Sequence, residues 1–314
     1  MTKLFDENLG SASNGHKLSV LMQKYQQYDP VYVAVSTMTA RPEFREFLEN
    51  IWKQYEPYAD TNFIKDFKKQ FSQRSWELYL GSTLLNRGQK LGRHSNTGPD
   101  IKVPFKFVDV WVEAISVKKG DGHDKVPEVE NGVWTDVPEE KMLLRLTSGL
   151  MEKYMKYKTY VKNKVISPKD PFVIAIDRSP LEHTDPQVPL ILKCLFAIGH
   201  QVLYLKRNKP VAQPEGSNWS ARGKINKISG SNVEMLMFRD ETFEGVSAVI
   251  YSDKNILNSP RDREKMGDNL TIVYNPFAKN PLPNNFFKFG ESWIQVGSQV
   301  KKISSVIKPQ NGRT

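Results

Sequence analysis

The sequence predicts an α/β fold in which helices flank a mixed central sheet, with a helical extension at the N-terminus. Three observations favour this fold. Two strands, near residues 100–103 and 106–117, form a short meander between two long helical patterns. A fully apolar strand follows at residues 172–176, and a buried helix and a further strand come after it. Strand, helix and strand in that order imply a parallel crossover.

The N-terminal part of the chain has helical periodicity. Residues 17–28 and 42–57 both follow a helical pattern, and the second begins at Pro42, which suits a first helical turn. We therefore expect a helical extension over residues 1–60, followed by one α/β domain over residues 61–314.

The stretch from Thr61 carries apolar residues at helical intervals and predicts one long helix that ends near Gly88. Glu77 lies beside the apolar stripe of this helix. Gly81, one turn further on, would leave open space next to the carboxylate. A Glu on an ordinary helix is usually solvated, so the interest of Glu77 depends on its neighbours.

Two further acids follow in the meander. Asp100 comes after the sharp turn Gly98-Pro99, which is also ordinary turn chemistry. Glu113 interrupts the apolar strand VDVWVEAISV, where an unpaired carboxylate would be costly, so it needs a metal or a cationic side chain. Asp109 lies four residues earlier on the same face of the strand. It could serve as an extra metal ligand, or it could lie in water at the strand edge.

Three carboxylates brought together by a helix and two strands would suit Mg²⁺ or Mn²⁺ and the hydrolysis of phosphodiester bonds. Hard cations take oxygen ligands from few carboxylates plus substrate phosphates, and a bound metal activates water. The order helix Glu (Glu77), Pro99-Asp100 and strand Glu (Glu113) resembles the PD-(D/E)xK nuclease superfamily. The resemblance implies a restriction-endonuclease-like core with Glu77, Asp100 and Glu113 around the metal.

The resemblance departs from the family pattern at its last position, where Ile115 replaces the lysine of Glu-x-Lys. A lysine there would stand beside Glu113 and orient the attacking water. Some branches of the superfamily supply this group from the next helix. The segment from Lys153 to Tyr157 matches the spacing of their Gln-x-x-x-Tyr motif, so Lys153 is the expected catalytic lysine; Lys118 and Lys119 are competing choices.

The net charge of +10 is concentrated in two segments. Residues 61–90 carry +4 and residues 141–165 carry +6, so the rest of the chain is neutral. These are the predicted helices before and after the carboxylate strands, where a basic surface would border a phosphate-binding cleft. The residues expected to bind nucleic acid are Lys141, Arg145, Lys156, Tyr157 and Lys158.

The tyrosines in this second helix have two interpretations. Tyr154, Tyr157 and Tyr160 alternate with lysines, a mixture that can stack on unpaired bases and contact phosphates. Tyrosines at a spacing of three also pack commonly against a core. The sequence leaves both interpretations open.

Composition narrows the class of protein. A chain of 314 residues with 39% hydrophobic residues and six tryptophans can bury a large core. Its single cysteine, Cys194, excludes an intrachain disulfide framework and a cysteine-rich zinc site. No apolar stretch is long enough to span a bilayer, and the N-terminus lacks the apolar core of a signal peptide, so we expect a cytoplasmic protein that does not enter membranes.

The segments after residue 164 predict further elements of the same sheet. PLILKCLFAIG predicts a buried helix ended by Gly199, and HQVLYL predicts the strand that completes the crossover. VEMLMF, VSAVIYS and LTIVYNP predict three more strands that could extend the sheet.

Three functions are consistent with these features. The first is a Mg²⁺- or Mn²⁺-dependent nuclease, with DNA as the expected substrate. The second is a nuclease fold that binds nucleic acid without cutting it, which Ile115 favours. The third is a structural or interaction protein whose acids are accidental. For the first, the resemblance also allows for a homodimer, because many enzymes of this superfamily that cut both strands act as dimers.

Overall fold

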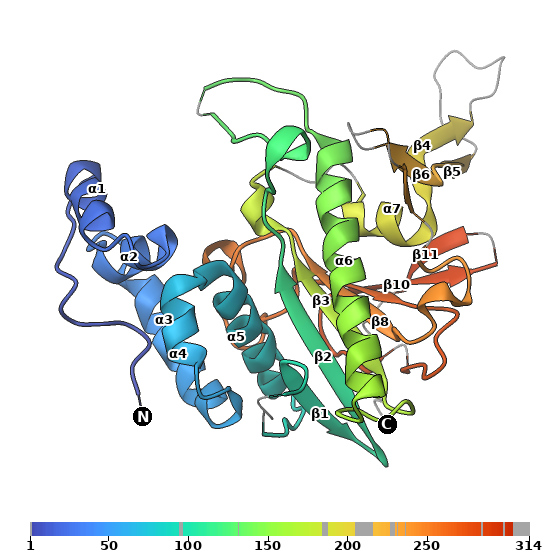
Figure 1. Ribbon diagram of the computed structural model, residues 1–314, viewed down its shortest axis with the longest axis horizontal. Coiled ribbons are helices and arrows are strands. Elements are labelled where there is room, and N and C mark those ends of the chain that lie inside the picture. The colour runs from blue at the N-terminus through green and yellow to red at the C-terminus, as the bar shows by residue number, and fades with distance from the viewer. Residues whose placement is uncertain are drawn as a thin grey trace, which may run out of the picture.

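A seven-stranded mixed sheet with helices on both faces forms the centre of the computed structural model (Figure 1). The predicted α/β class is therefore confirmed. The structure describes all residues except 1, 94–96, 131, 184–187, 205–215, 227–229, 231, 236, 284, 298 and 304–314.

The sheet has the strand order β1-β2-β3-β8-β9-β10-β11. Strands β2, β3 and β8 are parallel to one another, β9 and β10 are parallel, and the other neighbouring pairs are antiparallel. The strands are β1 (Ile101–Phe105), β2 (Val108–Ser116), β3 (Phe172–Asp177), β8 (Ala248–Ser252), β9 (Thr271–Tyr274), β10 (Glu291–Val296) and β11 (Gln299–Ile303).

Each face of the sheet has its own apolar core. Strand β3 shows the alternation: Val173 and Ala175 face one cluster, whereas Ile174 and Ile176 face the other. The first cluster includes α5 (Phe71–Asn86) and the N-terminal helices, and the second includes α6 (Glu139–Lys162) and α7 (Leu190–Phe196). Helices α5 and α6 thus cover opposite faces beside β2 (Figure 1).

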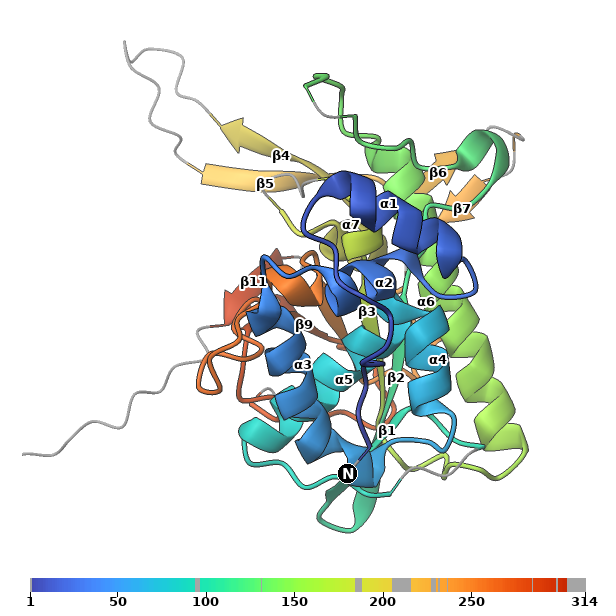
Figure 2. The ribbon, with the colours of Figure 1, turned by 90° about the vertical axis from the view of Figure 1, so that its left-hand side faces the viewer.

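The N-terminal extension is helical and packs against α5 (Figure 2). Helix α3 begins at Pro42 as predicted, and α2, which was not predicted, precedes it with Asp29 as its N-cap. The helices of this layer are α1 (Gly15–Lys24), α2 (Pro30–Thr37), α3 (Pro42–Tyr55) and α4 (Phe63–Lys69).

The single long helix predicted from Thr61 to Gly88 is wrong. It is broken at Gln70, whose backbone (φ −138°, ψ 56°) is not helical, so α4 and α5 are separate. The Asp29 carboxylate accepts a hydrogen bond from Phe71 N at 3.2 Å, which satisfies a free amide at the start of α5. Because Asp29 is distant from Phe71 in the sequence, the helical periodicity of residues 61–88 could not predict this contact.

The predicted crossover from residues 172–176 through a helix to HQVLYL is also wrong. Helix α7 ends at Phe196 with Ala197 as its C-cap in the left-handed conformation, and Gly199 lies inside a strand. This strand, β4 (Ile198–Tyr204), pairs with β5 (Gly216–Ala221) in a separate two-stranded sheet. The next parallel strand beside β3 in the central sheet is instead β8, from VSAVIYS.

The other late segments differ in outcome. LTIVYNP forms β9 of the central sheet, whereas the segment VEMLMF contributes to β7 (Asn232–Glu234), which pairs with β6 (Lys224–Asn226) outside it. Five short 3₁₀ helices are found in the connections along the described chain: η1 (Glu56–Tyr58), η2 (Gly122–Asp124), η3 (Ser179–Leu181), η4 (Glu241–Phe243) and η5 (Ile256–Asn258).

Within the described residues, no helix has the length and apolar character needed to cross a bilayer.

Candidate active site

Glu113, from the middle of β2, is the most deeply buried acid next to the basic helix α6. Its side chain is 1% exposed, and Lys153 Nζ and Lys156 Nζ each lie 2.9 Å from its Oε1. Tyr160 donates its hydroxyl to Oε2 at 3.2 Å. The carboxylate that the apolar strand could not stabilise is thus held by two cations and a phenol.

These three partners share one face of α6 because they are three, four and seven residues apart. Lys153 is buried and Lys156 is half exposed. Against the lowering effect of partial burial, the Glu113 carboxylate raises the pKa of Lys156 above its ordinary value. Helix α6 thus brings two lysine ammonium groups to one carboxylate oxygen.

A glycine allows α6 to come this close to the sheet. A Cβ at Gly149 would lie 3.0 Å from Val117 Cγ1 and 3.4 Å from Ile115 Cδ1. A side chain at this position would therefore meet Val117 and Ile115 at closer than ordinary contact distance. The close approach brings Lys153, one turn further on, onto Glu113.

Asp100 lies immediately before β1 and lines the cleft described below. Its Oδ2 accepts a hydrogen bond from Ala114 N at 2.7 Å, which fixes the carboxylate beside the residue that follows Glu113. Burial and the nearby charge of Glu113 raise the pKa of Asp100, and Lys153 opposes this effect. The two carboxylates therefore interact electrostatically at the end of the β1–β2 pair.

Gln73, from α5, completes this end of the sheet. The pairing of β1 with β2 stops at Ile101 and Val112, so the next backbone groups of β2 lack a strand partner on that side. Gln73 Nε2 donates to Ala114 O at 3.1 Å, and its Oε1 accepts from Ser116 N at 2.8 Å. A side-chain amide thus replaces the missing strand, which sequence periodicity gave no reason to expect.

Glu77 is fully buried in α5 and points to the N-terminal layer. Tyr55 donates its hydroxyl to Glu77 Oε1 at 3.0 Å, and Arg74 donates to Oε2 at 2.8 Å. Burial and the charge of Asp100 raise the pKa of Glu77, and their effect outweighs the opposing effect of the Arg74 ion pair. Glu77 therefore lies within electrostatic reach of Asp100 although its own hydrogen bonds go to other elements.

The expected open space at Gly81 does not exist. A Cβ there would lie 2.3 Å from Tyr55 Cε2, because the ring of Tyr55 fills the position. Gly81 thus allows Tyr55 to reach Glu77 rather than leaving room for a ligand. The N-terminal extension in this way supplies a direct partner to one of the three predicted acids.

A cleft of about 470 Å³ opens between α5 and α6 over the end of β2. It contains Ile115 at the position where the superfamily pattern has lysine. Its cationic lining residues exceed its acidic ones, which are Asp100 and Glu152. The cations are Arg74, Lys118, Arg145, Lys153 and Lys156.

The predicted nucleic-acid-binding residues divide into three groups. Arg145 and Lys156 line this cleft. Lys141 is half-buried elsewhere on α6, and the Lys158 ammonium lies 4.5 Å from the centroid of the Tyr154 ring. Tyr157 packs against Phe172 and is 8% exposed, so its ring is not available to stack on a base, and the core-packing interpretation holds for it.

The two competing lysines are placed differently. Lys118 lines the cleft, and its carbonyl oxygen accepts a hydrogen bond from Arg145 Nε at 2.8 Å. Lys119 forms ion pairs with Glu128 and Glu182, which hold it away from Glu113. Of the three lysines considered, Lys153 is the one in direct contact with Glu113.

The carboxylates do not form a three-ligand cluster. Among the described residues, no group of three His, Cys, Asp or Glu side chains could hold a metal ion. Glu77 is held by Tyr55 and Arg74, and Asp109 forms an ion pair with Lys102 at 2.7 Å.

Asp100 lines the cleft, and Glu113 lies beside it with both oxygens bonded to Lys153, Lys156 and Tyr160. Carboxylates are the ligand type that Mg²⁺ takes, one or two at a time with water and phosphate oxygens, but a cation at Glu113 would have to displace a lysine.

Comparison with protein-family models, with curated proteins and with solved structures finds no match to this chain.

Proposed function

We propose that this protein is a metal-dependent nuclease of the restriction-endonuclease-like kind that hydrolyses phosphodiester bonds in DNA. The observation that carries the proposal is the contact between Lys153 Nζ and Glu113 Oε1 at 2.9 Å, beside Asp100 in a basic cleft. This lysine comes from α6 and takes the place left by Ile115.

The cleft is suited to hold a phosphate backbone. Lys118 and Arg145 contribute positive charge along its walls, and Arg side chains bind phosphates with paired hydrogen bonds. Arg74 also lines the cleft, but its guanidinium is paired with Asp60, Asp66 and Glu77. The cleft draws its positive charge from α6 and the end of β2, which supports this proposal over a structural protein with accidental charges. Of the basic residues expected from segment 61–90, Arg74 lines the cleft, and α5 itself carries no net charge.

The cation would be held by Asp100 and Glu113. The electrostatic repulsion between these two carboxylates is relieved by a positive ion, and both lie at the end of the same pair of strands. When bound, Mg²⁺ or Mn²⁺ supplies an activated water and charge stabilisation at the leaving oxygen. Glu77 would not bind the cation directly, because its hydrogen bonds go to Tyr55 and Arg74.

Lys153 would orient the attacking water and stabilise the negative charge that develops on it. Its burial limits its motion, and its hydrogen bond to Glu113 fixes its direction. Lys156 binds the same oxygen but is half exposed, so it is better placed to contact the phosphate. Lys153 would therefore act on the attacking water, and Lys156 would bind the substrate phosphate.

A second candidate is a nucleic-acid-binding protein without catalysis. Two lysines on one oxygen of Glu113 compete with a metal ion for that carboxylate, and the described residues hold no three-ligand cluster. Ile115 in the cleft is consistent with the loss of the ordinary lysine. This candidate keeps the basic cleft as a phosphate-binding surface only.

The experiment is cleavage of circular and linear, single- and double-stranded DNA by purified protein with Mg²⁺ or Mn²⁺. Glu113→Gln should abolish cutting, whereas the matched control Asp109→Asn, on the same strand and paired with Lys102, should cut like the parent. Salt-dependent binding without cutting on any substrate would reject the nuclease and support the second candidate.

A further inference from the structure

Two aromatic side chains are almost fully exposed among the described residues. Phe107 is 102% exposed at the tip of the β1–β2 hairpin, and Trp134 is 99% exposed in the long loop before α6. Aromatic rings are usually buried, because the contact of their large apolar area with water is unfavourable. An exposed ring is therefore a candidate contact for a partner.

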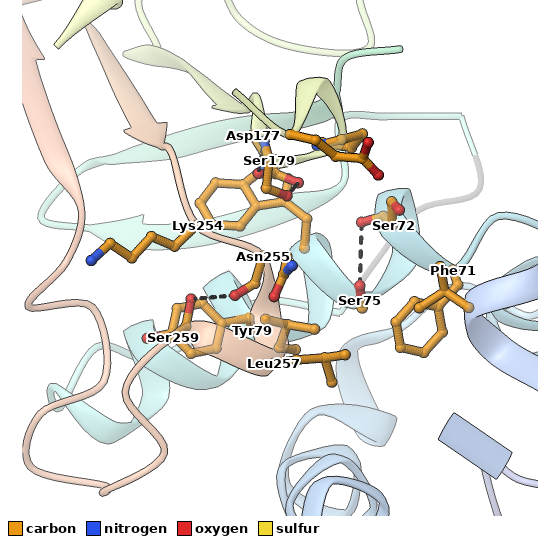
Figure 3. A pocket seen from close by; sticks show the side chains of 15 residues that line it. Phe71, Ser72, Ser75, Tyr79, Asp177, Ser179, Lys254, Asn255, Leu257 and Ser259 are labelled. Atoms are coloured by element: carbon orange, nitrogen blue, oxygen red, sulfur yellow. Dashed lines mark hydrogen bonds between the residues drawn. The ribbon is translucent and has the colours of Figure 1, made fainter. Parts of the chain in front are cut away.

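The rings that line the internal cavity at the carboxyl ends of β3 and β8 differ from these two. This cavity of about 200 Å³ is lined by aromatic residues that are 1–4% exposed, Phe71, Trp76 and Tyr79 (Figure 3). Asp177 in the same cavity is 4% exposed and already accepts hydrogen bonds from Ser116 Oγ and from Ser179 N and Oγ. The cavity thus offers neither a ring face nor an accessible carboxylate to a base, whereas Phe107 and Trp134 present their rings to solvent.

The tip that carries Phe107 departs from the usual chemistry of hairpin turns. Phe105 pairs with Val108, so the turn consists of Lys106 and Phe107. Lys106 has a left-handed backbone (φ 53°), a conformation for which two-residue hairpin turns usually have Gly or Asn. Neither side chain of the turn is buried in the core. Positions where local preferences are broken together are typically functional.

The surroundings of the tip are basic. Lys106 is exposed, and the turn that follows α6 carries the exposed Lys164 and Lys169. The end of α6 and the hairpin tip lie at the same end of the molecule (Figure 1, Figure 2). Asp109, the acid of β2 nearest the tip, is paired with Lys102 at 2.7 Å. This end of the sheet therefore attracts a polyanion.

Trp134 lies in the opposite electrostatic environment. Residues 126–140 contain five acids and no lysine or arginine. The negative charge of this loop repels a phosphate backbone. Trp134 is thus an equally exposed aromatic residue that we do not expect to contact nucleic acid.

Strand β2 connects the hairpin tip to the cleft. Asp109, Trp111 and Glu113 are two residues apart and therefore share one face of this strand. Phe107 precedes Glu113 by six residues, which corresponds to about 20 Å along an extended strand. Successive base pairs of a duplex are about 3.4 Å apart, so this distance corresponds to about six nucleotides of a paired strand.

We propose that Lys106 and Phe107 form a second contact for the DNA held in the cleft, in which Phe107 stacks on an unpaired base and Lys106 binds a neighbouring phosphate. This contact rests on the proposed function, and it narrows the substrate to DNA with unpaired bases about 20 Å from the phosphate in the cleft. An aromatic face accepts any base, whereas the bases inside a duplex are stacked on one another. Single-stranded DNA and duplexes with a single-stranded extension therefore fit the tip, and a fully paired duplex does not.

Fluorescence anisotropy with labelled oligonucleotides, measured without metal ions so that nothing is cut, tests the proposal. Phe107→Ala and Phe107→Leu should each weaken the binding of a single strand about 5- to 100-fold, whereas Phe107→Tyr should bind like the parent because it keeps a ring. For a fully paired duplex the same two substitutions should change the affinity by at most about twofold. Lys106→Gln should reduce the salt dependence by about one phosphate contact.

Trp134→Leu is the matched control and should bind the single strand like the parent. Equal binding of the single strand by the parent and Phe107→Leu, or an equal loss in Trp134→Leu, would overturn the proposal. Binding to vesicles of phosphatidylcholine and phosphatidylserine that Phe107→Leu weakens, with unchanged binding of oligonucleotides, would overturn it in favour of a lipid surface. A parent that binds the single strand through Phe107 but cuts no DNA would reject only the nuclease.

Discussion

Removing Glu113 should destabilise the protein more than removing its ion-pair partner Lys153. Lys156 lies 2.9 Å from the same oxygen of Glu113, so Lys153→Met leaves the carboxylate with a cation. Among the described residues, Glu113→Gln instead leaves the buried Lys153 with the exposed Glu152 as its acidic partner, at 3.8 Å. Losing one partner of a buried pair costs about 3–5 kcal/mol in general.

We therefore expect Glu113→Gln to lower the free energy of unfolding by about 3 kcal/mol and Lys153→Met by about 1 kcal/mol. The double variant should be more stable than Glu113→Gln alone, because Met removes the unpaired charge. The two energies are obtained from urea unfolding followed by circular dichroism.

An exposed ion pair provides the control. Lys265 and Asp262 lie 4.0 Å apart with mostly exposed side chains, so Lys265→Met should change the free energy of unfolding by less than about 0.5 kcal/mol. If Lys153→Met destabilises the protein as much as Glu113→Gln, or if the double variant is the least stable, the proposed sharing of Glu113 by two lysines is incorrect.

Three other predictions concern the surroundings of the site. Gly81→Ala should destabilise the protein by about 1–3 kcal/mol, measured by urea unfolding, because its Cβ would displace the ring of Tyr55; an unchanged midpoint would contradict the packing. Gln73→Ala should cost about 1–3 kcal/mol through two lost backbone hydrogen bonds, and Gln73→Glu should restore at most one of them. The pKa of Asp177 is raised from 3.8 to about 6 in the folded state, so its charge costs stability increasingly as pH rises through this range. The stability of Asp177→Asn relative to the parent should thus grow by about 1 kcal/mol between pH 5 and pH 8, and a constant difference would refute this.

The apolar patterns of short segments were sufficient to predict two central strands of the sheet. The alternation in VDVWVEAISV and the apolar run at residues 172–176 correspond to β2 and β3. The buried position of Glu113 followed from its place in an apolar strand. Lys153 was predicted from the resemblance, because Lys153 and Tyr157 match the spacing of the Gln-x-x-x-Tyr motif, and it contacts Glu113.

Contacts between distant segments could not be predicted in the same way. The break at Gln70 depends on Asp29, the closed space at Gly81 depends on Tyr55, and Gln73 replaces a strand partner that exists only in the folded sheet. The separation of β4 from the central sheet depends likewise on its pairing with β5.

The same limit applies to the candidate site. Three acids in a plausible order did not reveal that Glu77 turns to the N-terminal layer. Tyrosines among lysines did not reveal that Tyr157 packs in the core whereas Tyr160 reaches Glu113. Such differences are decided by side-chain directions of a few tens of degrees around a helix, which spacing alone defines too coarsely.

The most direct test of the central claim is rescue of cleavage at the position of Ile115, which lines the cleft beside Lys153. Single-turnover DNA cleavage with Mg²⁺ would be compared among the parent, Lys153→Met and the double variant Lys153→Met, Ile115→Lys. We predict a loss of about 10²- to 10⁴-fold in Lys153→Met and a partial recovery in the double variant, because a lysine two residues after Glu113 shares its face of the strand. Unchanged cleavage in Lys153→Met, or no cleavage by the parent, would contradict the account.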